Sequence, residues 1–143
     1  MLGLCLGLAG QLWAQVAVDN PPAQFSLSWR HTVEKILWQE DYQLTPQGLQ
    51  IVQARVKGTG AGMEIPDDAK FYDDSWHYQP QLAPIPVLRL GRAPEAGDYQ
   101  LCFGGNCQPM SHWIGAPNHQ VEAVELWSCQ LSPSADNEQT HDQ

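Results

Sequence analysis

The chain has 143 residues, enough for one domain with a single hydrophobic core and too few for two ordinary domains. Hydrophobic residues make up 43% of it and six residues are Trp, so the chain can bury a core and is not globally disordered. The formal net charge is -9, with only seven Lys and Arg in total. This balance argues against binding to nucleic acid or to an anionic membrane surface, because both need clustered basic side chains.

Residues 1–17 are typical of an export signal, and we expect cleavage after Ala14 or Ala17. The stretch from Met1 to Ala14 is almost entirely apolar, carries no charge and is too short to span a bilayer. A lipid anchor on Cys5 is disfavoured because no small residue directly precedes it. The mature chain is then expected to have no stable membrane insertion. The alternative is that this segment is a buried N-terminal helix or strand of the domain.

Short strands separated by Gly and Pro turns are predicted for the residues that follow. From Phe25 to Arg30 apolar and polar side chains alternate, which is the period of a half-buried strand. The segment Thr45–Gly48 contains the Pro and Gly of a tight turn, and it joins the predicted strands Asp41–Leu44 and Leu49–Val56 into a hairpin. Further strands are predicted at Trp76–Tyr78, Val87–Leu90, Tyr99–Phe103, Gln108–Trp113 and Val121–Trp127.

This series of short strands predicts an all-β fold, either a small antiparallel β-sandwich or a partly open barrel. We expect a single β domain over residues 25–129. Residues 130–143 are rich in Ser, Asn, Gln and acidic side chains, so they are predicted to form a disordered acidic tail.

Two of the four cysteines are close in sequence. Cys102 and Cys107 are separated by four residues, three of which favour turns, so a hairpin could bring the two sulfur atoms within bonding reach. We predict a disulfide between them in an oxidising compartment. Cys129 then has no partner if Cys5 is removed with the leader, and pairing of Cys129 with Cys102 or with Cys107 is the alternative. Zinc binding is disfavoured because no second pair has finger-like spacing.

Four segments of the chain resemble one family of proteins. They are Ser28–Lys35, Glu40–Tyr42, the glycine-rich segment Gly58–Glu64 and Leu101–Cys107. On these segments the chain is similar, from about Phe25 to Cys129, to the family known as domain of unknown function 1850. Its members are small exported proteins, often encoded beside a tripartite ATP-independent periplasmic (TRAP) transporter of the TAXI type. The resemblance implies a periplasmic accessory role with the transporter's membrane subunit or solute receptor as partner, and it implies no activity and no cofactor.

Polar residues within these segments predict a binding patch. We expect the His31–Glu34 stretch and the glycine-rich segment to meet at one end of the sheet, because a loop held by glycines can approach a neighbouring strand closely. The predicted patch consists of Arg30, His31, Glu34, Glu40, Gly60, Gly62, Glu64 and Trp76. Arg30 would balance the carboxylates, and Trp38 or Trp76 would lie at the edge.

Other functions fit the residues less well. A metal site would require the fold to gather His31, His77 and His112, whose spacing matches no known metal motif. The run Gly58–Gly62 lacks the Lys-Ser/Thr of a phosphate-binding loop. No nucleophile and base can be assigned together, which disfavours a hydrolase. We therefore expect a non-catalytic periplasmic accessory protein that binds a partner protein, with a periplasmic small-ligand or metal-binding module as the alternative.

Overall fold

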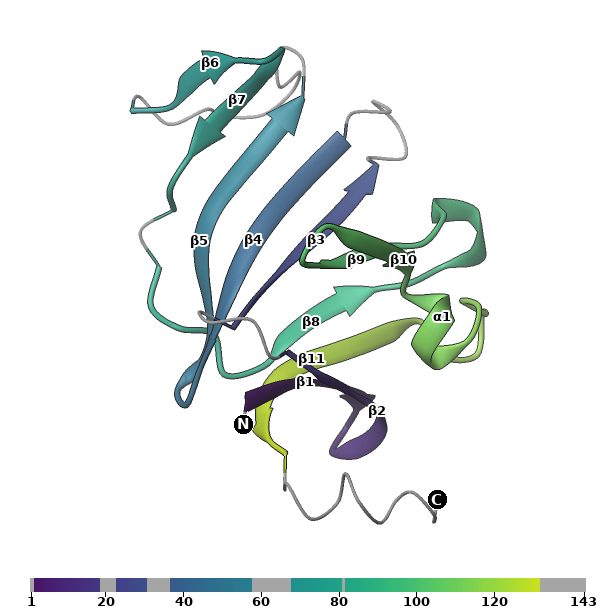
Figure 1. The fold of residues 1–143 in the computed structure, drawn as a ribbon. Coiled ribbons are helices and arrows are strands. Elements are labelled where there is room, and N and C mark those ends of the chain that lie inside the picture. The colour runs from purple at the N-terminus through teal and green to yellow at the C-terminus, as the bar shows by residue number, and fades with distance from the viewer. Residues whose placement is uncertain (1, 19–22, 31–36, 58–67, 81, 132–143) are drawn as a thin grey trace.

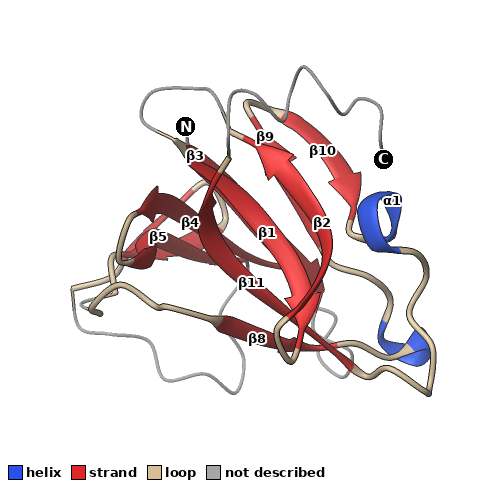
Figure 2. Ribbon diagram, turned by 90° about the horizontal axis from the view of Figure 1, so that it is seen from below, coloured by secondary structure: helices blue, strands red, loops and turns tan. Residues whose placement is uncertain are grey.

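The structure is a computed structural model that describes residues 2–18, 23–30, 37–57, 68–80 and 82–131. Its strands form two antiparallel sheets that pack against each other, so the fold is an all-β sandwich, as the sequence predicts (Figure 1). Figure 2 shows the same two layers from below. None of the helices within these residues is long and apolar enough to cross a bilayer.

The two sheets contain four and seven strands. The smaller sheet has the order β2 (Gln11–Ala17), β1 (Leu2–Leu8), β11 (Ala123–Gln130) and β8 (Leu88–Gly91). The larger sheet has the order β10 (Asn106–Pro109), β9 (Gln100–Phe103), β3 (Gln24–Arg30), β4 (Leu37–Thr45), β5 (Gly48–Lys57), β7 (Ser75–Tyr78) and β6 (Lys70–Tyr72). Within the described residues, two short helices, η1 (Pro94–Ala96) and α1 (Ser111–Ile114), lie in connections.

The N-terminal hairpin belongs to the folded domain. β1 lies between β2 and β11, and its residues Leu4, Cys5 and Leu6 are buried. The domain of the structure therefore begins well before the predicted residue 25. A short apolar run without charges is typical of a strand buried on both faces as well as of an export signal, and composition alone does not separate the two. Cleavage of residues 1–17 stays a prediction.

Glycine makes this hairpin possible. The register of β1 and β2 shifts between Leu6 and Gly7, and a Cβ atom on Gly7 would lie 1.9 Å from the carbonyl oxygen of Gln11. The turn residues Ala9 and Gly10 have φ angles of 53° and 81°, the positive values that tight hairpin turns require. Ala9 and Gly10 are thus suited to a hairpin turn, which an export signal does not require.

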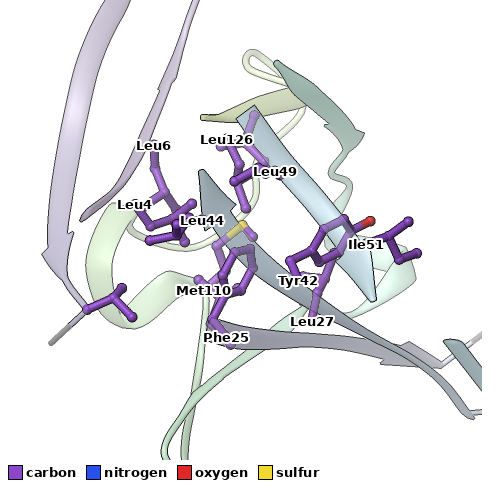
Figure 3. Packing of buried hydrophobic residues seen from close by; sticks show 13 residues of the cluster. Leu4, Leu6, Phe25, Leu27, Tyr42, Leu44, Leu49, Ile51, Met110 and Leu126 are labelled. Atoms are coloured by element: carbon purple, nitrogen blue, oxygen red, sulfur yellow. The ribbon is translucent and has the colours of Figure 1, made fainter. Parts of the chain in front are cut away.

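The core lies between the two sheets (Figure 3). Alternate residues of the strands supply it, as expected for sheets with one buried face. The larger sheet contributes Phe25, Leu27, Tyr42, Leu44, Leu49, Ile51 and Leu101, and the smaller sheet contributes Leu4, Leu6, Val124 and Leu126. The rings of Phe25 and Tyr42 stack with their centroids 5.4 Å apart, which joins β3 to β4 through the core.

The predicted hairpin around Thr45–Gly48 is confirmed, because β4 ends at Thr45 and β5 begins at Gly48. The predicted strand Gln108–Trp113 is only partly correct. β10 ends at Pro109, and a helical turn begins at Ser111, whose backbone N–H donates to Asp98 Oδ2 at 2.7 Å. The sequence patterns predict neither β6 nor the Leu37–Glu40 part of β4.

Candidate functional site

The inner face of the larger sheet continues beyond the smaller sheet. In Figure 1 the upper ends of β3, β4 and β5 and the whole β6–β7 hairpin project away from β1, β2, β8 and β11. Five residues at successive register positions across these strands form what we call the aromatic row: Trp29, Trp38, Val56, Trp76 and Phe71. They lie on the same sheet face as the core residues Phe25 and Leu27, because side chains alternate along a strand.

Ring contacts hold the aromatic row together. Trp29 stacks on Trp38 with centroids 6.0 Å apart, and Phe71 meets Trp76 edge to face at 5.2 Å. Val56 is fully buried at the centre of the row, whereas Phe71 at its end is 51% exposed. The three Trp side chains are half-buried. The row therefore retains aromatic surface that no other described residue covers completely, and such surface is typical of interaction sites.

Glu40 places a carboxylate on this apolar face, one residue pair closer to the core than the aromatic row. Glu40 pairs with Leu27 on β3 and with Ala54 on β5, and Ala54 pairs in turn with Tyr78 on β7. The hydroxyl of Tyr42 donates to Glu40 Oε1 at 2.6 Å. Glu40 thus lies between the buried Tyr42 and the aromatic row.

The surroundings of Glu40 change its acidity and that of its neighbours. Burial raises the pKa of Glu40 above the ordinary glutamate value, and the hydrogen bond from Tyr42 opposes this only in part. Burial, and then the negative charge of Glu40, raise the pKa of Tyr78. Burial and nearby charges, Glu40 among them, also raise the pKa of Tyr99, whose ring meets Trp29 edge to face at 5.9 Å. A basic group brought to this face would relieve the cost of the buried charge.

Glu40→Gln keeps an acceptor for Tyr42 and removes the charge. A carboxyl whose pKa is raised in the folded protein holds its proton more tightly there than in the unfolded chain. Its contribution to the stability of the folded state is therefore present at low pH and is lost as the pH rises through the folded pKa. We therefore expect Glu40→Gln to be at least as stable as the wild-type protein at neutral pH and to lose any advantage below the ordinary glutamate pKa of about 4.3. Urea denaturation at both pH values measures this difference.

Asp41 follows Glu40 on β4 and lies on the opposite face of the sheet, so Asp41→Asn is the matched control for Glu40→Gln. Burial alone would raise its pKa, but hydrogen bonds from Arg55 and Ser26 outweigh burial and lower it. The ionised Asp41 carboxylate therefore stabilises the folded state at neutral pH, and this stabilisation is lost as the pH falls. Asp41→Asn is expected to reduce stability at neutral pH. A clear loss of stability in Glu40→Gln at neutral pH would contradict our account of this site.

The predicted patch residues fall into three groups. Glu40 and Trp76, together with Trp38, lie on the inner face. Arg30 lies on the opposite face in the strand alternation and pairs with Leu37. The other members, His31, Glu34, Gly60, Gly62 and Glu64, lie outside the described residues, so the shared patch stays a prediction.

The strand register nevertheless shows where the strands that flank the His31–Glu34 stretch and the glycine-rich segment begin and end. β3 ends at Arg30 and β4 begins at Leu37, next to the Trp29–Trp38 pair. β5 ends at Lys57, next to Val56 in the aromatic row. Both attachment points are therefore at the aromatic end of the sheet.

Three tyrosines that interact with Glu40 were not among the predicted site residues. They are Tyr42, Tyr78 and Tyr99. The sequence contained part of the pattern that indicates this site, because Trp38, Glu40 and Tyr42 alternate along one strand and therefore share a face. Tyr78 lies on β7 and Tyr99 directly precedes β9, and only the register brings them near.

The cysteines form two disulfides. Cys102 and Cys107 lie opposite each other on β9 and β10 and are bonded, which confirms the prediction. Cys129 is bonded to Cys5 on β1, so the suggested pairings of Cys129 with Cys102 or Cys107 are wrong. Those pairings followed from the expectation that Cys5 is removed with the leader. Two disulfides in a small β domain fit an exported protein.

The histidines that the structure describes do not come together. His77 stacks on Tyr72 at the β6 edge of the larger sheet, and His112 meets Trp113 in α1, beyond the β10 edge. His31 lies outside the described residues. Among the residues that the structure describes, no group of three or more His, Cys, Asp or Glu could hold a metal ion.

One comparison with known proteins gives a match. The model of the family described as domain of unknown function (DUF1850) matches residues 25–110, which span β3 to β10 and hence the larger sheet with its aromatic row. No curated protein and no solved structure matches the chain. With more than half of its residues matched, the chain belongs to the DUF1850 family.

Proposed function

We propose that this protein is an exported, non-catalytic binding protein that holds a partner protein on its aromatic row. The observation that carries the proposal is the row itself, whose rings keep exposed surface on a sheet face that the smaller sheet does not cover. Half-buried Trp side chains in such a patch are the residue type that most often dominates binding energy at protein interfaces.

The chemistry of the face indicates the kind of partner. The row offers apolar and aromatic area, and Glu40 places one carboxylate beside it. The net charge of -9 adds a negative field around the whole chain. The complementary partner is an apolar segment that carries a Lys or Arg, since that charge would pair with Glu40 and steer the encounter.

The partner that we propose is a component of a TAXI-type TRAP transport system, either its membrane subunit or its solute receptor. Support comes from the family to which the chain belongs and from the two disulfides, which fit a compartment that permits them. Such a system places its solute receptor in the periplasm, so we propose the same location for this protein.

Capture experiments with tagged protein from periplasm and membrane test this proposal. We expect the wild-type protein to retain a transporter component, and Trp76→Ala to weaken the measured affinity at least about thirtyfold, which corresponds to about 2 kcal/mol at an interface hot spot. Phe71→Ala should weaken it too, and it carries less risk to folding because Phe71 is largely exposed. The matched control is Tyr72→Ala, which changes the next residue on the other face of β6. Equal binding by all three variants, each shown to be folded by circular dichroism, would refute the role of the aromatic row.

A further inference from the structure

The opposite face of the same strands carries an open cleft of about 670 Å³. Its volume is within the range of small-molecule sites. The cleft is lined by Gln24, Asp41, Val52, Gln53, Asp68, Lys70, Tyr72, His77, Tyr78 and Gln79. A smaller cleft of about 270 Å³ adjoins it at His77 and includes Gln39 and Arg55. We call the larger one the outer cleft.

The floor of the outer cleft is fixed by a network around Arg55. Its guanidinium donates to both carboxylate oxygens of Asp41 at 2.8 Å, and Asp41 Oδ1 also accepts from Ser26 Oγ at 2.7 Å. Arg55 further donates to the side-chain oxygens of Gln39 and Gln53, at 3.2 and 3.3 Å. Two-point pairing of this kind fixes geometry as well as charge. The Asp41–Arg55 pair is thus electrically balanced and holds the Gln53 amide in place.

One wall of the outer cleft is an aromatic platform. The ring of Tyr72 stacks on the His77 imidazole, with centroids 3.7 Å apart and an interplanar angle of 9°. His77 Nε2–H donates to the Tyr72 carbonyl oxygen at 3.2 Å, which leaves Nδ1 as a buried acceptor without a partner among the described residues. The turn residues Asp73 and Asp74 both have positive φ, as a tight hairpin turn requires, and they fix the two strands that carry the stack. Tyr72 remains 48% exposed.

The charges of the cleft narrow the class of ligand. Asp68 and Lys70 both line it and have opposite signs, and Asp41 is neutralised by Arg55. The described lining therefore carries no excess charge, and such a lining does not favour phosphates or metal cations, which need concentrated opposite charge. The remaining polar groups include the side-chain amides of Gln24, Gln53 and Gln79, each of which offers both donors and acceptors.

We infer that the outer cleft binds a neutral saccharide, with a sugar ring against Tyr72 and sugar hydroxyl groups bonded to the side-chain amides that line the cleft. A sugar ring has apolar C–H groups on its faces and hydroxyls around its rim, so it matches an aromatic platform beside amide groups. This site goes beyond the proposed function, because it uses the sheet face opposite the aromatic row.

Titration of the isotope-labelled full chain with neutral mono- and disaccharides, followed by amide chemical shifts, tests the site. Glucose, galactose, mannose, maltose and trehalose form the panel, with glucuronate and glucosamine as charged comparisons. We expect a neutral sugar to shift amides of β6, β7 and the middle of β5, and to bind at least as well as the charged sugars. Tyr72→Ala should bind it about tenfold more weakly, in the range of a lost ring contact, whereas Tyr72→Phe should keep the affinity.

Several results would overturn the inference. They are the absence of shifts with every neutral sugar, shifts confined to other strands, preference for a charged sugar, or unchanged affinity in Tyr72→Ala. Phe71→Ala is the matched control, since Phe71 precedes Tyr72 and lies on the inner face. It should bind the sugar normally but lose partner capture, so failure of the saccharide site and failure of the proposed function give different results.

Discussion

Replacing Cys5 or Cys129 with Ser is expected to lower the free energy of unfolding by about 5 kcal/mol. The two cysteines are 124 positions apart, so their bond closes nearly the whole described chain into one loop and removes much of the entropy of the unfolded state. The bond also ties β1 to β11, the two central strands of the smaller sheet. Few other single changes can affect the stability of this domain as much.

The second disulfide provides the matched control. Cys102 and Cys107 are only five positions apart, and loss of so small a loop is expected to cost about 2 kcal/mol. Denaturant unfolding of the Cys5→Ser and Cys102→Ser variants, each paired with Ser at the partner cysteine, measures both costs under non-reducing conditions. Equal losses, or a smaller loss for the Cys5–Cys129 pair, would contradict the prediction.

The Cys5–Cys129 disulfide makes it possible to measure whether the N-terminal segment is retained. If residues 1–17 were cleaved, the mature protein would lack β1, β2 and the partner of Cys129. Intact mass and N-terminal sequence of the exported protein distinguish this from retention of the hairpin. In the structure Leu4 and Leu6 pack in the core, so removal of the segment would expose the apolar core residues that they cover.

The sequence predicted those parts of the fold whose signal is local. The alternation in β3 and the Pro-Gly turn between β4 and β5 each depend on a few neighbouring residues, and both are confirmed. The N-terminal strands were predicted only as the alternative to an export signal, because a buried strand and an export signal share the same composition. Its distinguishing features, the fit of Gly7 against Gln11 and the bond from Cys5 to Cys129, depend on residues that only the folded chain brings together.

The candidate site was predictable only in part, for a related reason. Glu40 and Trp76 stood out as polar and aromatic residues in strand-like segments, but their neighbours depend on register. A β-bulge between β4 and β5 makes Tyr42 pair with Ile51 while Asp41 pairs with Gln53. Ile51 and Ala54, three positions apart, therefore share the buried face, which strict alternation would forbid. Sequence alone does not show where such a bulge occurs.

A buried ion pair connects three segments at the end of the sandwich next to Tyr99. The side chain of Arg92 is 5% exposed, and its Nη2 donates to Asp98 Oδ1 at 3.1 Å and to the Gly115 carbonyl oxygen at 3.0 Å. Asp98 also accepts the backbone N–H groups of Tyr99 and Ser111, at 2.9 and 2.7 Å. One carboxylate thus connects the residues after β8, the start of β9 and the first turn of α1, and it fixes the backbone of the tyrosine that packs against Trp29.

Asp98→Ala is expected to lower the free energy of unfolding by about 3 kcal/mol, because it leaves a buried guanidinium without its carboxylate and two backbone N–H groups without their acceptor. Glu125→Ala is the control, since it breaks only exposed contacts, namely an ion pair with Arg89, whose side chain is 62% exposed, and a hydrogen bond from the Ala9 N–H; it should cost at most about 1 kcal/mol. Urea denaturation gives both values. If the loss in Asp98→Ala arises from the stranded charge, adding Arg92→Met should recover part of it. A loss in Asp98→Ala no larger than that in Glu125→Ala, or a double variant less stable than Asp98→Ala alone, would show that the pair does not stabilise this end of the sandwich.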